Sequence, residues 1–286
     1  MSKHALTFHL VQSVSLGALV CALAVVTGCD PGGEPDSVQP RAGSIDPVPV
    51  PAQATVESGT NPASASGEGS LHDQIMALQP QKTRAGWLRI TDPIINTPEA
   101  APILIERLVA GGDTPEVRAA LAEAIGRTTA DYADRVSPLI SSEADPRVRE
   151  MLVGTLGRQA PSPAAHVGLM AGLQDSDASV RAAAARTIAA RKDGAELAEG
   201  LIRLLQDQDN KVCADTARSL GVLGVDAAKH GMVDLLAHAD PEVRLQALRA
   251  IDRIDPSFAA SLGSLATLAE DGDVRVQRLA VSIRQR

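Results

Sequence analysis

The segment Asp145-Pro-Arg-Val148-Arg149-Glu-Met-Leu152-Val-Gly-Thr-Leu156-Gly157 decides the fold, because five other segments resemble it at nearly constant spacing. Each has a turn with an acidic residue, then Val, usually Arg, and a run of small residues. The six segment starts are Asp113-Thr-Pro-Glu-Val117-Arg118, Asp145-Pro-Arg-Val148-Arg149, Asp177-Ala-Ser-Val180-Arg181, Asp209-Asn-Lys-Val212-Cys213, Asp240-Pro-Glu-Val243-Arg244 and Asp271-Gly-Asp-Val274-Arg275. Their valines lie 31, 32, 32, 31 and 31 residues apart. This period predicts stacked helical units that bury their apolar faces against one another.

Apolar residues follow each Val at spacings of four, which place them on one stripe of a helix. The three clearest stripes are Val117, Leu121 and Ile125; Val148, Leu152 and Leu156; and Val180, Ala184 and Ile188. We expect these stripes to pack between neighbouring units. Each such helix is the second of a pair, and ends near Gly126, Gly157, Ala190, Gly221, Ile254 or the C-terminus.

The first helices of the pairs are expected at 98–110, 131–142, 163–174, 194–206, 226–238 and 256–269. Thr97-Pro98, Ser162-Pro163 and Asp255-Pro256 have the pattern of an N-cap followed by Pro at the first helical position. Gly111-Gly112 is expected to end the helix before it.

The composition agrees with an all-α protein. Of the 286 residues, 44% are hydrophobic but only 1% are aromatic, so Ala, Leu, Val and Ile supply the core. We therefore predict an α-solenoid of about six helical hairpins over residues 96–286. Residues 71–95, which contain the single Trp87, are expected to cap its N-terminal end.

The N-terminus resembles a bacterial lipoprotein signal peptide, residues 1–28. An apolar run from Leu10 to Val26 ends in Val26-Thr27-Gly28-Cys29, which is similar to a lipobox. That resemblance implies cleavage before Cys29 and its lipidation, with anchoring through several acyl chains. A plain secretory signal or an uncleaved anchor are the alternatives. Asp30 resembles an inner-membrane retention signal of some enteric bacteria, and the choice of membrane stays open.

Residues 29–70 are predicted to be a disordered tether behind the lipid. Between residues 30 and 70 there are seven Pro, six Gly and six Ser, and no apolar period. Folding of this segment on a partner is the alternative. Cys213 would be the remaining thiol of the mature chain, and we interpret it as a buried small residue rather than a reactive one.

The repeated pattern Asp-x-x-Val-Arg-x-x-Ala-x-x-x-Leu/Ile-Gly resembles HEAT-like repeats, a kind also found in phycobilin lyases. The resemblance covers about two thirds of the chain. It implies a right-handed stack of helical pairs whose second helices line a concave face, and it implies little about activity.

The same resemblance implies a structural ladder, in which the Arg after Val pairs with carboxylates of the inter-helix turns. The matching residues are Arg118, Arg149, Arg181, Arg244 and Arg275. The fourth unit has Cys213 instead, so we expect the ladder to be weakest there and a Cys213→Arg exchange to raise the melting temperature.

No catalytic motif is apparent in the sequence. HEAT-like iron hydroxylases use His-Glu pairs, and none of the six His here precedes Glu. His230, Asp234 and His238 lie at helical spacing and could form a weak metal site, but a solvated helix face is the simpler interpretation. His166 with a Ser and an Asp would form a triad only by chance. We expect no metal, cofactor or small-molecule substrate.

Nucleic-acid binding is not expected either. Residues 71–286 carry 25 Lys and Arg against 29 Asp and Glu, and only three aromatic residues. Neither a basic field nor a stacking platform is therefore present.

An arginine row is the main candidate for a binding surface. Six residues after the repeated Val, three successive units have Arg186, Arg218 and Arg249, and Arg158 and Arg253 extend the row at ten residues. Such a row on the concave face would suit an acidic segment of a protein partner. The alternative is a solvated face of ordinary ion pairs.

The sequence thus favours an exported, non-catalytic scaffold or adaptor. It would be lipid-anchored to the cell envelope, face the periplasm and bind a protein partner, which could also be an envelope protein that it regulates. The alternative is a lyase-like or hydroxylase-like enzyme on the same scaffold.

Overall fold

The computed structural model describes residues 69–286. Every regular element in the described part is a helix. The predictions for the signal peptide, Cys29 and the tether up to residue 68 lie outside the described residues. Among the helices of residues 69–286, none combines the length and the apolar composition that a membrane span needs.

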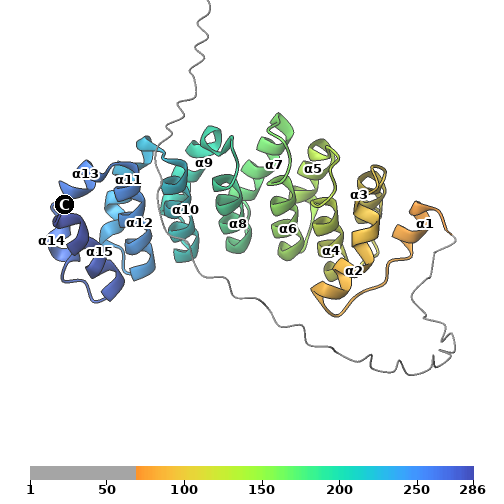
Figure 1. Cartoon of the computed structure of the whole chain (residues 1–286), viewed down its shortest axis with the longest axis horizontal. Helices are drawn as coiled ribbons and strands as arrows, with labels where there is room; N and C mark the ends of the chain where they lie inside the picture. The colour runs from red at the N-terminus through yellow and green to blue at the C-terminus, as the bar shows by residue number, and fades with distance from the viewer. Residues whose placement is uncertain (1–68) are drawn as a thin grey trace, which may run out of the picture. The chain divides into compact units, whose positions relative to one another are not determined.

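The helices from residue 100 onward form six pairs in two layers, which confirms the all-α solenoid (Figure 1). The second helices lie side by side in one layer and each contacts the next. They are α4 (Pro115–Ile125), α6 (Pro146–Leu156), α8 (Ala178–Ala189), α10 (Asn210–Leu223), α12 (Pro241–Ile254) and α15 (Val274–Arg284). The first helices, in the other layer, are α3 (Ala100–Ala110), α5 (Ala133–Ser142), α7 (Pro163–Leu173), α9 (Ala198–Arg203), α11 (Lys229–Val233) and α13 (Pro256–Ala260) with α14 (Leu265–Leu268).

Two further helices cover the N-terminal end of the array. α1 (Leu71–Met76) contacts α3, and α2 (Arg84–Ile95) contacts both α3 and α4. Trp87 is buried on α2. Arg107 fixes the cap, because its guanidinium donates to the carbonyl oxygens of Ile75 at 2.6 Å and Leu78 at 2.9 Å.

The predicted stripes form the core between neighbouring pairs. All nine residues of the three clearest stripes are at most 1% exposed. Full burial of a Val, Leu or Ile side chain stabilises a fold by about 1.5–3 kcal/mol. Contacts between repeats therefore supply much of the stability, as expected for units that cannot bury an apolar face alone.

The sixth repeat is two residues out of the predicted frame. Val274 is 51% exposed, whereas Val276 is fully buried. The carboxylate of Asp273 caps α15 by accepting from the Arg275 N–H, and Asp271 accepts the N–H of Asp273. The sequence 271–276 offers two aspartates and two valines at the same spacing, and the helix begins at the second aspartate.

The first helices become less regular toward the C-terminal end. Single helices were predicted at 194–206, 226–238 and 256–269. The first two contain the 3-10 turns η1 (Gly194–Leu197), η2 (Leu204–Gln206), η3 (Asp226–Ala228) and η4 (Asp234–Ala237), and the third is split into α13 and α14. At η1 the chain passes so close to α8 that a Cβ on Gly194 would lie 2.1 Å from the carbonyl oxygen of Ile188.

Several predicted helix ends are correct and one is not. Gly111 and Gly112 have φ of 74° and 87° and end α3, since only glycine adopts such angles at little cost. Ser162 and Asp255 cap α7 and α13. Thr97 does not cap α3, because its hydroxyl donates to the carbonyl of Ile94 at the end of α2.

Candidate functional site

The five arginines of the row belong to the second-helix layer. Arg186 is on α8, Arg218 on α10, and Arg249 and Arg253 on α12, while Arg158 follows the end of α6. The structure divides these five residues into two groups by the partners of their guanidinium groups.

Arg186 and Arg218 are held by one carboxylate, that of Asp215 on α10. Arg186 Nη1 donates to Asp215 Oδ2 at 2.6 Å, and Arg218 Nη2 donates to Asp215 Oδ1 at 2.9 Å. Burial opposes ionisation of Asp215, but hydrogen bonds from Lys211 and Arg186 outweigh it and lower the pKa of this carboxyl. Arg186 also lies 3.5 Å from Glu150. Arg186 therefore joins α8 to α6 and α10, whereas Arg218 pairs within its own helix.

Arg158, Arg249 and Arg253 are exposed, and none forms an ion pair with any of residues 69–286. Arg158 makes one long contact of 3.5 Å, from Nη1 to the carbonyl oxygen of Gly154. Their charges are therefore accessible to a partner.

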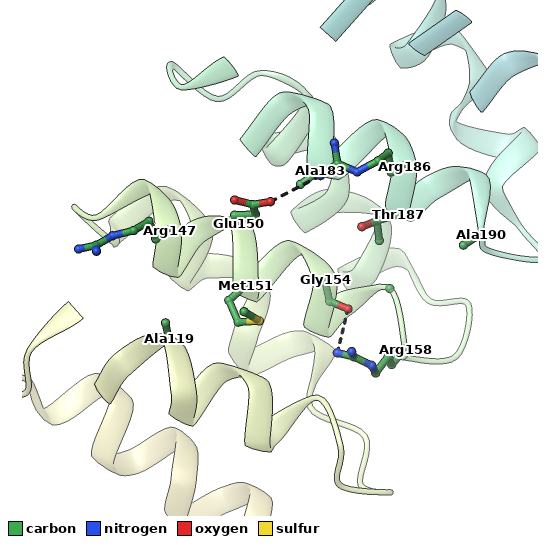
Figure 2. A pocket seen from close by; sticks show the side chains of 11 residues that line it. Ala119, Arg147, Glu150, Met151, Gly154, Arg158, Ala183, Arg186, Thr187 and Ala190 are labelled. Carbon is green, nitrogen blue, oxygen red and sulfur yellow. Dashed lines mark hydrogen bonds and ion pairs between the residues drawn. The ribbon is translucent and has the colours of Figure 1, made fainter. Parts of the chain in front are cut away.

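A hollow opens on the same layer, over α4, α6 and α8 (Figure 2). Its volume is about 650 Å³, within the usual range of ligand sites. The lining residues are Ala119, Arg147, Glu150, Met151, Gly154, Gly157, Arg158, Ala183, Arg186, Thr187 and Ala190. We call it the α6 hollow, because most of its lining comes from α6 and the two residues after it.

Four predicted ladder arginines span successive repeats as bidentate ion pairs. Arg149 Nε and Nη2 each lie 2.7 Å from a carboxylate oxygen of Asp175. The other pairs are Arg118 with Glu143, Arg181 with Asp207 and Arg244 with Asp271. Each arginine also donates through Nη1 to carbonyl oxygens of its own turn. The guanidinium groups of these four arginines therefore stabilise the contacts between repeats and are not available to a ligand.

Arg275 is not part of this ladder, which corrects the prediction. Because the repeat frame at α15 lies two residues later than expected, with Asp273 as the N-cap, the ladder position is Gln277. Arg275 instead pairs with Asp273 in its own turn at 2.9 Å and with Glu242 on α12 at 2.7 Å.

The ladder is interrupted at Cys213, where both sides of the pair differ. The acceptor position of the next turn holds His238, whose Nδ1 accepts the N–H of Asp240 at 3.0 Å. Cys213 Sγ lies 3.0 Å from the carbonyl oxygen of Asp207 in its own turn. Burial raises the pKa of this thiol, which agrees with a structural rather than a reactive cysteine.

The structure does not bring His230, Asp234 and His238 together as a metal site. The helix changes to a 3-10 turn at Asp234, so the assumed face is lost. His230 packs edge-on against Phe258 with ring centroids 5.0 Å apart. In residues 69–286, no three His, Cys, Asp or Glu side chains are grouped as metal ligands.

His166 belongs to a buried structural cluster. Its Nε2 lies 2.6 Å from Asp193 Oδ2, and Arg191 holds the same carboxylate at 2.7 Å. Arg191 also donates to the carbonyl oxygens of Leu156 and Gln159, both at 2.9 Å. The cluster therefore fastens the end of α6 to the turn after α8.

Sequence reasoning missed Asp215 and the α6 hollow. Asp215 lies three residues after Val212, and no other repeat has an acidic residue at the equivalent position. The sequence feature that could have indicated the hollow is Gly154. It has no side chain at a position where the neighbouring second helices have Glu123 and Arg186.

The chain is similar to several solved structures at low sequence identity. No curated protein matches the sequence. An engineered protein shares 20% identity at a TM-score of 0.48, covering 76% of this chain and 68% of its own. Another shares 21% at 0.46, covering 76% and 98%. The complex of CpcE and CpcF of phycocyanin lyase from Nostoc sp. PCC7120 shares 20% at 0.39, covering 80% of each chain.

A family model described as HEAT repeats matches residues 101–189 and, in a second frame, residues 133–221. The two matches share residues 133–189 and together span α3 to α10, where the structure shows the helical pairs, the buried stripes and most of the ladder. Residues 101–221 of this chain are therefore similar to HEAT repeats in sequence, and they form helical hairpins in the structure.

Proposed function

We propose that this protein is a non-catalytic scaffold of the bacterial cell envelope that binds an acidic segment of a protein partner on its second-helix layer. The observation that carries the proposal is the set of three exposed arginines, Arg158, Arg249 and Arg253, without an ion-pair partner in residues 69–286. Arginine suits this role because its planar guanidinium pairs with carboxylates through two hydrogen bonds. A HEAT-repeat array supports the proposal, since solenoids present extended surfaces to partners.

The test reverses the charge of the accessible arginines. A partner is first identified by crosslinking in intact cells, and its binding is then measured with purified proteins. Arg158→Glu, Arg249→Glu and Arg253→Glu together are expected to weaken binding by a hundredfold or more, about 1 kcal/mol for each lost pair. The melting temperature should change little, because no ion pair within the described residues is broken.

A charge-matched control uses exposed basic residues outside the second helices. Arg135 on α5, Arg203 on α9 and Lys82 before α2 provide one. Changing these three to Glu should leave affinity within about threefold, which is below 1 kcal/mol. Equal losses in the two triple variants would show that net charge alone matters and would contradict the proposed surface.

The envelope anchor is tested separately. It is supported by the lipobox-like Val26-Thr27-Gly28-Cys29. Cys29→Ser should abolish incorporation of labelled fatty acid and move the protein from the membrane to the soluble fraction. Unchanged fractionation would contradict the lipid anchor and leave the binding surface unaffected.

A further inference from the structure

Gly154 has no structural reason to be glycine. A Cβ built on it meets nothing within 4 Å, and its φ is not in the left-handed region. Other helical glycines are required by packing: a Cβ would lie 2.8 Å from Val153 at Gly172 and 2.8 Å from the Cα of Ala250 at Gly221. Glycine inside a helix lowers its stability relative to alanine. The fold alone would therefore favour a larger residue at position 154.

The missing side chain keeps the α6 hollow open. Gly154 and Met151 lie on its floor, between Ala119 of α4 and Ala183 of α8 (Figure 2). At the equivalent position the neighbouring helices carry long side chains, Glu123 on α4 and Arg186 on α8. A side chain of that length at position 154 would occupy the hollow.

The rim of the hollow has one positive charge that no carboxylate of the described residues compensates, that of Arg158. Three arginines and one glutamate line it, and that glutamate, Glu150, already lies 3.5 Å from Arg186. Arg147 is held by Asp145 at 2.9 Å. Arg158 has no carboxylate partner among the described residues. An apolar floor beside an accessible arginine suits an apolar side chain that is followed or preceded by a carboxylate.

We propose that the α6 hollow is the anchor subsite for the acidic partner segment. One bulky aliphatic or aromatic side chain of that segment enters over Gly154, and a neighbouring carboxylate pairs with Arg158. This inference rests on the proposed function and adds to it a sequence requirement on the partner. The charges of the arginine row then contribute to the affinity for the acidic segment. The hollow determines which residue of that segment lies over Gly154.

The test uses labelled acidic nonapeptides that differ only in the central residue, which is Trp, Leu or Gly. Binding to the mature chain, residues 29–286 in detergent, is measured by fluorescence anisotropy. The Trp and Leu peptides should bind about tenfold more tightly than the Gly peptide, because they bury an apolar side chain. Gly154→Trp should remove this difference, whereas the matched variant Gly154→Ala should retain most of it.

The outcomes separate the two proposals. Equal binding of all three peptides to the unaltered chain, or a difference that survives Gly154→Trp, would overturn the anchor subsite while salt-dependent binding upholds the acidic surface. Absence of binding by every peptide would contradict the acidic-segment function itself. Melting curves of both variants verify folding, and Gly154→Ala should melt no lower than the unaltered chain because its Cβ meets open space.

Discussion

Asp193 is buried between two basic side chains, and its ionisation contributes to the stability of the fold in acid. Burial opposes the charge, but hydrogen bonds from Arg191 and His166 outweigh burial and lower the pKa of Asp193 to about 2. A carboxyl in the unfolded chain has a pKa of about 3.9. Because the folded pKa is the lower one, the stabilisation is complete above about pH 4 and is lost as the pH falls toward 2.

We predict that Asp193→Asn flattens the dependence of stability on pH between about 4 and 2. At pH 7 the variant should lose up to about 3 kcal/mol, since Arg191 would remain buried without its counter-charge. Denaturant unfolding at a series of pH values measures both effects, and the exposed Asp134→Asn is the control. A variant that keeps the full slope in this pH window would show that other carboxylates dominate acid unfolding.

Two valines, Val274 and Val276, are candidates for the buried valine of the last repeat. Substitution of each shows which one belongs to the core. Val276→Asp should destabilise the terminal repeat by about 3 kcal/mol or more, because an unpaired charge would enter the core. Val274→Asp should change stability by less than about 0.5 kcal/mol, since the side chain is exposed. Chemical denaturation compares the two variants, and the reverse order would restore the frame expected from the 31-residue period.

At the scale of elements, the junction between α10 and α12 has no ladder ion pair, but its two helices pack closely. A Cβ on Gly221 would lie 2.8 Å from Cα of Ala250, so the two backbones nearly touch. Asn210 Nδ2 also donates to Asp240 Oδ2 across this junction at 3.1 Å. Close packing thus takes the place of the bidentate pair.

This geometry changes the expectation for Cys213→Arg. A single exchange would place a guanidinium against His238 in a buried site, so we predict a lower melting temperature rather than a higher one. Cys213→Arg with His238→Asp recreates the pair seen at Arg181 and Asp207 and should recover about 1–3 kcal/mol relative to the single variants. A double-mutant cycle measured by thermal unfolding gives the coupling. Additive effects would mean that the ladder geometry cannot form at this junction.

Sequence predicted the elements well where one physical signal dominated. The stripe at Val148, Leu152 and Leu156 has a single helical register, and all three residues are buried as expected. It failed where two registers were equivalent, as at Asp271 and Asp273, or where local backbone geometry shortened a helix, as at Gly194. Of the candidate site, spacing alone placed the arginines on one layer. Their pairing with Asp215 depends on contact between α8 and α10, which no single-helix pattern contains.

At the scale of the whole molecule, each repeat of the array contacts mainly its immediate neighbours, through stripes and ladder pairs. The free energy of unfolding is then a sum of contributions from single repeats and from contacts between neighbours. A destabilising substitution should therefore affect mainly the repeats next to it. We predict that Val276→Asp accelerates amide hydrogen exchange in α13 to α15 and leaves α4 to α8 protected. Val180→Asp, in the middle of the array, should instead expose amides on both sides, from α6 to α10, at a cost of about 3 kcal/mol or more. Exchange measured by mass spectrometry resolves these segments. A uniform rise across residues 69–286 in both variants would mean that the array unfolds as one cooperative block, and binding at the α6 hollow would then respond to substitutions in any repeat.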